Sequence, residues 1–264
     1  MQDYTTVIYY MKDAVFVAAD ALGGTNAGGA CDAAVAALLR GWFAKQNEPV
    51  AVLADGLPVP VLAHSEKQLE DYAQRLAYHD GPCFAVAALS GTAAYERGLR
   101  DYCVAVAYLE NRELKAAMVY DPAHAELFHA VQNLGAYLNG KSIKASGRKS
   151  LMEAYLSVDH GTLRMGKEEA LRGLIMQAQH VRCGAPFSLA LCYAACGRID
   201  AAVGRGQSFI DSAAGLLIAK EAGAKLLNED GNPLAPFDQI GQRISAAAAC
   251  PGIAKELGEI IAGL

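Results

Sequence analysis

The stretch FAVAALSGTAAYERGL, residues 84–99, contains the turn that most constrains the fold of this chain. Its first six residues are apolar and follow Cys83, as is typical of a strand buried on both faces. Ser-Gly-Thr at 90–92 supplies a turn signal, and the residues after it suit the first turn of a helix. A strand that turns tightly into a helix directs main-chain N–H groups at one place, so the stretch predicts an anion site.

The composition indicates a globular protein with a large core. The chain has 264 residues, of which 53% are hydrophobic, enough for one large domain or two closely packed halves. Its net charge of −5 and its pI near 5.7 argue against a general nucleic-acid surface. We therefore expect small molecules or a second copy of the chain as partners.

The N-terminal region and the cysteines favour a reducing compartment. Residues 1–30 lack a basic segment followed by a long apolar run, and no segment approaches the ~18 apolar residues that span a bilayer, so we expect a cytoplasmic protein without membrane contact. Most of the seven cysteines lie in apolar segments, as buried thiols do. Cys192 and Cys196 lie one helical turn apart without a matching pair or a nearby His, which favours core packing over metal binding.

Hydrophobic periodicity predicts two halves of an α/β (α+β) fold, 1–150 and 151–264, packed as one unit. The first half should place helices on a largely antiparallel sheet, and the second half should alternate strands with helices. The predicted helices are 4–22, 32–45, 66–80, 167–178, 186–197, 211–223 and one from 252, with a flexible turn at 23–29. The predicted strands are 49–55, 59–64, 83–89, 102–110, 114–120, 127–133, 154–160, 180–183, 199–204 and 224–229.

Two longer segments resemble the inositol monophosphatase family. Residues 120–146, YDPAHAELFHAVQNLGAYLNGKSIKAS, are similar to the hairpin that follows the metal-binding strand of that family. Residues 183–231 are similar to its C-terminal signature, in which a Trp-Asp pair opens a helix. The resemblance implies a five-layer α-β-α-β-α sandwich, a homodimer, and Mg²⁺-dependent hydrolysis of phosphate monoesters on small polyols and nucleotides. Mg²⁺ ions would neutralise the phosphate and bind the attacking water.

The metal ligands that the resemblance implies are mostly replaced in this sequence. Ala87 and Ser90 stand where the family turn carries two metal-binding Asp residues. The metal-binding Glu falls on Ser65 or, with a slip of one residue, on Glu66. Only Asp211 is clearly retained, which makes Glu66 and Asp211 weak metal candidates, and we expect no bound Mg²⁺ because the strongly hydrated ion gains little from one carboxylate.

Two residues of the implied water-activating arrangement survive. They are Asp32 and Thr92, and together with Asp211 they are the candidate catalytic groups if activity remains. Each also has a structural explanation, because each precedes or begins a predicted helix and can serve as its N-cap. The sequence leaves both interpretations open.

The implied ligand-binding segments also differ from the family pattern. We expect Ser90, Gly91 and Thr92 to bind an anion, with Gly184 and Ala185 lining the same cleft. The family presents main-chain amides at 184–186, whereas Pro186 has none. A Glu that contacts the polyol in the family falls on Gly204 here.

Charged and imidazole side chains at predicted strand ends complete the candidate set. Arg205 could supply a positive charge beside the missing Glu, or it could lie in an exposed turn. His64 could line the same cleft, as could His160, although a single His is more often structural or exposed.

Three functions follow from these departures. The first is a catalytically silent phosphatase homologue that binds a small anion or a protein partner. The second is an enzyme that carries out metal-independent chemistry in the same cleft through Asp32, Thr92 and Asp211. The third is a weak phosphatase that uses Glu66 and Asp211 with one Mg²⁺. Fold alone does not distinguish them.

Overall fold

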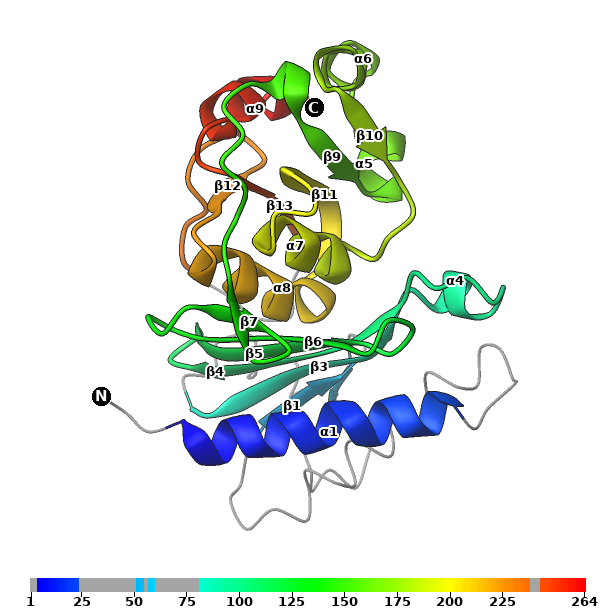
Figure 1. The fold of residues 1–264 in the computed structure, drawn as a ribbon, viewed down its shortest axis with the longest axis vertical. Coiled ribbons are helices and arrows are strands. Elements are labelled where there is room, and N and C mark those ends of the chain that lie inside the picture. Colours follow the sequence, from blue (N-terminus) through cyan, green and yellow to red (C-terminus); the bar gives the residue numbers. More distant parts are fainter. Residues whose placement is uncertain (1–3, 24–50, 55–56, 60–80, 238–242) are drawn as a thin grey trace.

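The protein is built from alternating layers of helix and sheet, as a computed structural model shows (Figure 1). The structure describes residues 4–23, 51–54, 57–59, 81–237 and 243–264. Helix α1 (Thr5–Gly23) covers the outer face of an eight-stranded sheet, and α7 (Phe187–Ala195) and α8 (Phe209–Glu221) lie on its other face. A five-stranded sheet follows, and α6 (Glu168–Gln177) and α9 (Ala254–Ile261) cover it from outside. The α-β-α-β-α order is confirmed.

The eight-stranded sheet is largely antiparallel, as expected. Its order is β2-β1-β3-β4-β5-β6-β7-β8, and only β1 and β3 pair in parallel among its described strands. The bounds are β1 Ala51–Ala54, β2 Leu57–Val59, β3 Cys83–Ser90, β4 Cys103–Glu110, β5 Glu113–Asp121, β6 Glu126–Val131, β7 Ala136–Leu138 and β8 Lys141–Ile143.

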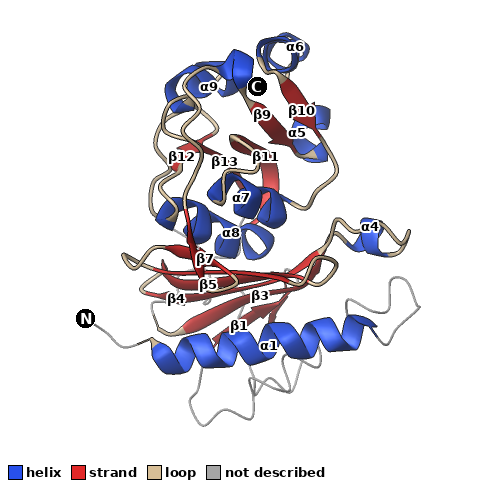
Figure 2. Ribbon diagram, viewed as in Figure 1, coloured by secondary structure: helices blue, strands red, loops and turns tan. Residues whose placement is uncertain are grey.

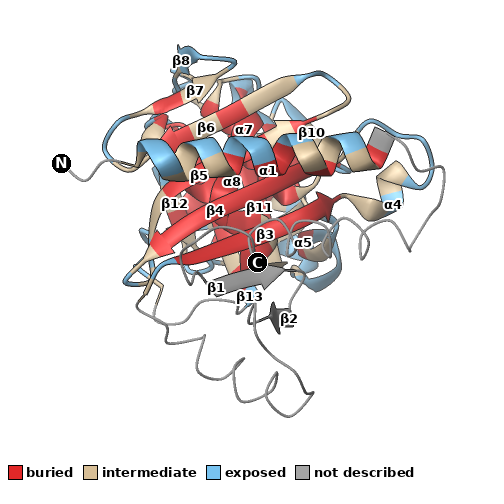
Figure 3. Ribbon diagram, turned by 90° about the horizontal axis from the view of Figure 1, so that it is seen from below, coloured by how far each residue is buried: buried red, intermediate tan, exposed pale blue. Residues whose placement is uncertain are grey.

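The central strands of this sheet are buried because helices cover both faces. In β3, Ala85 and Ala87 point to the cluster formed with α7 and α8, whereas Phe84 and Val86 point to α1. Figure 3 shows α1 crossing the buried strands β3 and β4. The apolar run at 83–89 therefore has no polar face, which explains why it reads as a continuous hydrophobic segment.

The five-stranded sheet is mixed and has the order β10-β9-β11-β13-β12 (Figure 2). β9 pairs in parallel with β10 and β11, whereas β13 pairs antiparallel with β11 and β12. The bounds are β9 Tyr155–Val158, β10 His180–Arg182, β11 Ala201–Ser208, β12 Lys225–Asn228 and β13 Arg243–Ala249. The short helices are α4 Thr92–Tyr95, α5 His160–Met165 and the 3-10 turn Leu151–Glu153.

Most predicted elements within the described ranges are confirmed, with a shift of a few residues at their ends. The described strands β1 and β2 agree with the prediction of two strands in 49–64, and the remaining residues of those two predicted strands lie outside the described ranges. The sequence interpretation missed β7, β8, β13 and α5. The helices predicted at 32–45 and 66–80 and the turn predicted at 23–29 lie largely or wholly outside the described residues. Within the described ranges, every helix is too short or too polar to cross a bilayer.

Candidate functional site

The turn at 90–92 lies where β3 leaves the sheet. Ser90 pairs with Cys103 of β4, and the register shifts between Ala87 and Ser90, which marks an irregularity in β3 just before the turn. Gly91 has φ +93° and precedes α4, whose amides at Ala94 and Tyr95 donate to the Gly91 carbonyl. The predicted order of strand, tight turn and helix is therefore confirmed.

Gly91 is required by its conformation and by its neighbours. A Cβ built on it would lie 2.5 Å from the Asp101 carbonyl oxygen and 2.7 Å from Cγ of Pro186. Both contacts involve atoms of low freedom, a main-chain carbonyl and a proline ring. The turn is thus held between the loop before β4 and the loop before α7.

The capping interpretation of Thr92 is wrong in its detail. The N-cap of α4 is Gly91, and Thr92 is the first helical residue. Its Oγ1 donates a hydrogen bond to the carbonyl oxygen of Leu89 at 3.3 Å, and this side-chain bond links the first residue of α4 to the end of β3. A helix of four residues has a small dipole, so any anion at this turn has to be bound by individual amides.

Asp211 lies close to the same turn, in the first turn of α8. Burial, and after it the negative charge of Asp211, hold the pKa of the Cys103 thiol well above its ordinary value, and Cys103 is the pairing partner of Ser90. The Ser188 hydroxyl donates to the Asp211 carbonyl oxygen, which fixes the start of α8 against α7. Asp211 is the third residue of α8 and Ser208 is its N-cap, so the capping interpretation of Asp211 is wrong.

The loop before α7 lies against the Gly91 turn, where the sequence predicts the ligand cleft. Pro186 touches the Gly91 turn and is the N-cap of α7, preceded by Gly184 and the nearly buried Ala185. Phe187 covers Gly204 of β11, because a Cβ at Gly204 would lie 2.8 Å from Cδ2 and Cε2 of the Phe187 ring. The space beside Gly204 therefore holds an aromatic ring, and an acidic side chain there would displace it.

Arg205 does not reach this cleft. Side chains alternate along β11, so Arg205 points away from the face on which Gly204 meets α7. Its Nη2 lies 3.9 Å from Glu229 Oε2, and its Nη1 is buried and has no hydrogen-bond partner among the residues that the structure describes. The expectation that Arg205 supplies positive charge to the anion site is wrong for this structure, since its guanidinium lies on the side of α9.

Asp159 is a site-organising residue that the sequence interpretation missed. Its carboxylate accepts hydrogen bonds from the amides of Gly161 at 2.5 Å and Arg205 at 3.1 Å, and from Nε2 of Gln207 at 2.7 Å. It is the N-cap of α5, and the Asp-His-Gly-Thr sequence is a capping signal. These donors occupy its oxygens, so Asp159 holds the ends of β9 and β11 together.

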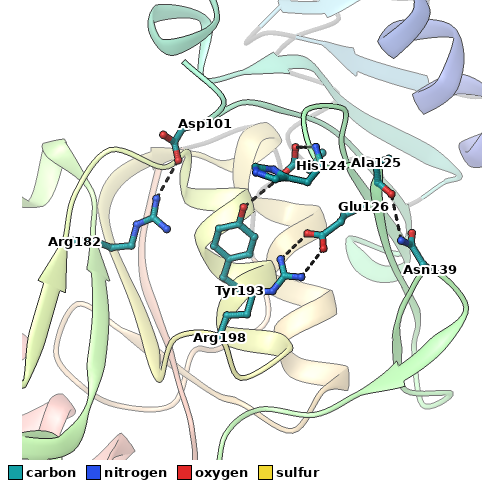
Figure 4. A network of polar contacts seen from close by, with 9 residues as sticks. Asp101, His124, Ala125, Glu126, Asn139, Arg182, Tyr193 and Arg198 are labelled. Carbon is teal, nitrogen blue, oxygen red and sulfur yellow. Dashed lines mark hydrogen bonds and ion pairs between the residues drawn. The ribbon is translucent and has the colours of Figure 1, made fainter. Parts of the chain in front are cut away.

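A cluster around Tyr193 joins the two halves beside the cleft (Figure 4). The fully buried Asp121 accepts from the amide of His124 at 3.2 Å and lies 2.8 Å from its Nδ1 and 3.3 Å from the Tyr193 hydroxyl. The Tyr193 ring lies between two guanidinium groups, with Arg182 Cζ 5.8 Å and Arg198 Cζ 5.2 Å from its centroid. Burial, followed by the charge of Asp121, raises the pKa of Tyr193, so its hydroxyl is a neutral donor.

The two arginines extend this cluster to both sides. Arg198 forms a two-pronged ion pair with Glu126 at the start of β6, with both N···O distances 2.5 Å. Arg182 pairs with Asp101 at 3.0 Å, and the main-chain carbonyl of Asp101 lies so close to Gly91 that it leaves no room for a Cβ atom there. Arg182 therefore links the strand before the Pro186 loop to Asp101, whose main-chain carbonyl lies next to Gly91.

In the part of the chain that the structure describes, Ser90 and Thr92 carry hydroxyl groups at the turn, and Asp211 is the carboxylate whose charge acts on the neighbouring Cys103. Among the described residues, no group of three or more His, Cys, Asp or Glu is arranged to hold a metal ion. Mg²⁺ prefers an octahedron of oxygen ligands that includes carboxylates, and this donor set does not match it. Asp32, His64, Ser65 and Glu66 lie outside the described residues. His160 is described, and it is exposed at the start of α5.

The sequence model of the inositol monophosphatase family matches residues 50–262. This chain belongs to that family. It is 36% identical over 157 residues to the Nus factor SuhB of Xylella fastidiosa, with 58% of this chain and 57% of the relative covered. It is 32% identical over 174 residues to inositol monophosphatase 1 of Solanum lycopersicum, with 63% and 62% covered. The alignments thus span less than two thirds of these relatives.

Solved structures of the family share the whole fold. Inositol monophosphatase from Anabaena superposes with a TM-score of 0.81 at 24% identity, covering 98% of this chain and 96% of that one. The extragenic suppressor protein SuhB of Bartonella henselae superposes with a TM-score of 0.81 at 22% identity, covering 97% and 99%. The protein is therefore phosphatase-like in sequence and in architecture.

Proposed function

We propose that this phosphatase-like protein does not hydrolyse phosphate monoesters with Mg²⁺, and that it binds a small anion at the Gly91 turn without a metal. The observation that carries the proposal is the pair Ala87 and Ser90 in the turn where the family resemblance implies two carboxylates. Ala87 is buried in the core and offers no ligand atom. One carboxylate, Asp211, does not hold a strongly hydrated dication against a phosphate.

The same replacements favour metal-free anion binding. Each missing carboxylate removes a negative charge that would repel an anion at short range. The chain passes from the end of β3 through Gly91 into α4, so several main-chain amides follow one another at the turn, of which those of Ala94 and Tyr95 donate to the Gly91 carbonyl. We infer that phosphate, sulfate or a carboxylate is held by main-chain amides and by the Ser90 hydroxyl.

Recognition of the rest of the ligand differs from that of a polyol phosphatase. Phe187 fills the space beside Gly204, where the resemblance implies a Glu that contacts the polyol. An aromatic ring offers apolar contact and no hydrogen-bond acceptor for hydroxyl groups. We infer that a ligand of this cleft carries fewer hydroxyl groups than inositol.

The catalytic part of the proposal is tested by turnover. Purified protein is incubated with inositol monophosphate, fructose bisphosphate or a 3′-phosphonucleotide, with Mg²⁺ or with chelator, and released phosphate is measured. We expect no release above the buffer blank in either condition. Mg²⁺-dependent release that disappears in Asp211→Asn would support a weak phosphatase instead, and release that persists in chelator would support metal-independent chemistry.

The binding part is tested by thermal shift in the presence of chelator. An anion that binds only the folded state raises the melting temperature with concentration, by RT ln(1 + [L]/Kd) in free energy. Ser90→Asp should remove the shift caused by phosphate, whereas the isosteric Ser90→Asn should retain most of it, because only the first adds a negative charge. A shift of equal size in both variants would place the anion elsewhere.

The assembly of the chain stays a prediction. We propose a homodimer on the strength of the family resemblance, and light scattering coupled to size exclusion measures it directly. A monomer at all concentrations would contradict it. A cytoplasmic location likewise stays a prediction.

A further inference from the structure

A cavity of about 520 Å³ lies beside the C-terminal half of α8. We call it the Leu216 pocket. It lies between the start of β5, the C-terminal half of α8 and the β12 hairpin. β5 runs from Glu113 at this pocket to Asp121 in the Tyr193 cluster, so eight steps of ~3.3 Å place the two ends about 26 Å apart. The pocket is therefore separate from the Gly91 cleft.

The inner surface of the Leu216 pocket is apolar. Leu216 and Leu217 of α8 are almost fully buried beneath it. The side walls are formed by half-buried chains that pack on the main core, namely Leu114, Leu226, Leu234 and Phe237. A cavity of this size with such a lining is typical of sites for small molecules.

The wall formed by the β12 hairpin is held by hydrogen bonds. The amide of Leu234 donates to the Leu226 carbonyl at 3.0 Å, and the amide of Asn228 donates to the Asn232 carbonyl at 2.7 Å. Phe237 packs edge-on against Phe209, with ring centroids 4.9 Å apart. The pocket is thus largely formed before any ligand binds.

The rim of the pocket is positive, although the chain as a whole is negative. Lys220 and Lys225 are exposed at its edge, and neither has an ion-pair partner in the described part of the chain. Among the described lining residues the acidic group is Glu113, which pairs with Lys115 at 2.6 Å and whose pKa is lowered mainly by that lysine and to a smaller extent by Lys220. An apolar interior with an excess of ammonium groups at its rim is complementary to a molecule with an apolar body and one negative end.

We propose that the Leu216 pocket binds a small amphipathic carboxylate, with its alkyl chain against the half-buried side walls above the buried leucines and its carboxylate between Lys220 and Lys225. The pocket has no contact with the anion turn, so the proposal does not depend on the function proposed for that turn. The carboxylate stays at the wet rim, where it keeps part of its hydration, while the chain leaves water.

Methyl NMR of leucine-labelled protein, titrated with octanoate, tests the proposal. We expect saturable shifts at the methyl groups of Leu216, Leu217 and Leu226, with a dissociation constant on the order of 1 mM or lower. Hexanoate should bind several-fold more weakly, because each methylene contributes up to about fourfold. Octanol, which lacks the charge, should also bind more weakly than octanoate.

A pair of double variants gives the matched control. Lys220→Glu with Lys225→Glu should weaken octanoate binding by about tenfold or more, since two attractions become repulsions. Lys141→Glu with Lys255→Glu changes the net charge equally at exposed sites outside the pocket and should leave binding unchanged. Equal effects in both variants, equal binding of octanol, or an absence of shifts at the pocket leucines would each overturn the proposal. Loss of binding in Ser90→Asp alone would place octanoate at the Gly91 turn.

Discussion

The substitution Gly91→Ala measures how tightly the Gly91 turn is held. At φ +93° an alanine costs roughly 1–2 kcal/mol because its Cβ crowds the main chain. That Cβ would also lie 2.5 Å from the Asp101 oxygen and 2.7 Å from Pro186 Cγ. Relieving such overlap against main chain and a proline ring costs about 1–3 kcal/mol. We expect the free energy of unfolding to fall by about 2–5 kcal/mol in total.

Gly98→Ala separates the two contributions. Gly98 has φ +71° at the end of the α4 turn, and a Cβ there meets nothing within 4 Å. Gly98→Ala should therefore lower the free energy of unfolding only by the conformational cost of the positive φ, roughly 1–2 kcal/mol. The stabilisation that comes from a less flexible unfolded chain is the same in both variants. The difference between the variants therefore reports the contact of Gly91 with Asp101 and Pro186.

Urea unfolding followed by circular dichroism gives both free energies, provided that a second probe shows the same transition. In a thermal scan, each 1 kcal/mol corresponds to about 2–4 °C for a chain of this size. Equal destabilisation by Gly91→Ala and Gly98→Ala would refute the reasoning, because it would mean that the two loops do not close on the turn.

Two further predictions concern charge. The hydrogen bond from Arg198 lowers the pKa of Glu126, so this pair stabilises the fold above pH ~4.5 and loses its effect as pH falls through the lower folded pKa. Glu126→Gln should thus cost about 0.5–1 kcal/mol near neutral pH and progressively less in acid, and a constant difference down to the pH at which the protein unfolds would contradict this. Ala87→Asp with Ser90→Asp should create Mg²⁺ binding together with Asp211, measured by calorimetry, whereas the matched pair of Asn substitutions should not. Heats that remain at the dilution level in a folded Asp variant would show that these positions do not converge.

Local pattern alone determined most of the framework. The apolar runs at 83–89 and 102–110 predicted buried strands, and the periodicity of 4–22 predicted α1, because these segments repeat at the spacing of their own secondary structure. The Ser-Gly-Thr signal at 90–92 predicted the turn, since glycine adopts a left-handed φ at the least steric cost. These features depend on interactions between residues that are close in sequence, so the sequence alone is enough to predict them.

Tertiary structure decided the features that depend on distant segments. β13, RISAAAA, is rich in the best helix former, yet it is a strand because β11 and β12 pair with both of its edges, while helices cover both faces and leave room only for small side chains. The same holds for the site: Phe187 covers Gly204, and Arg205 turns toward Glu229. Which face of β11 meets α7 is set by packing between elements rather than by any local propensity, so the direction of the Arg205 side chain could be found only in the folded protein.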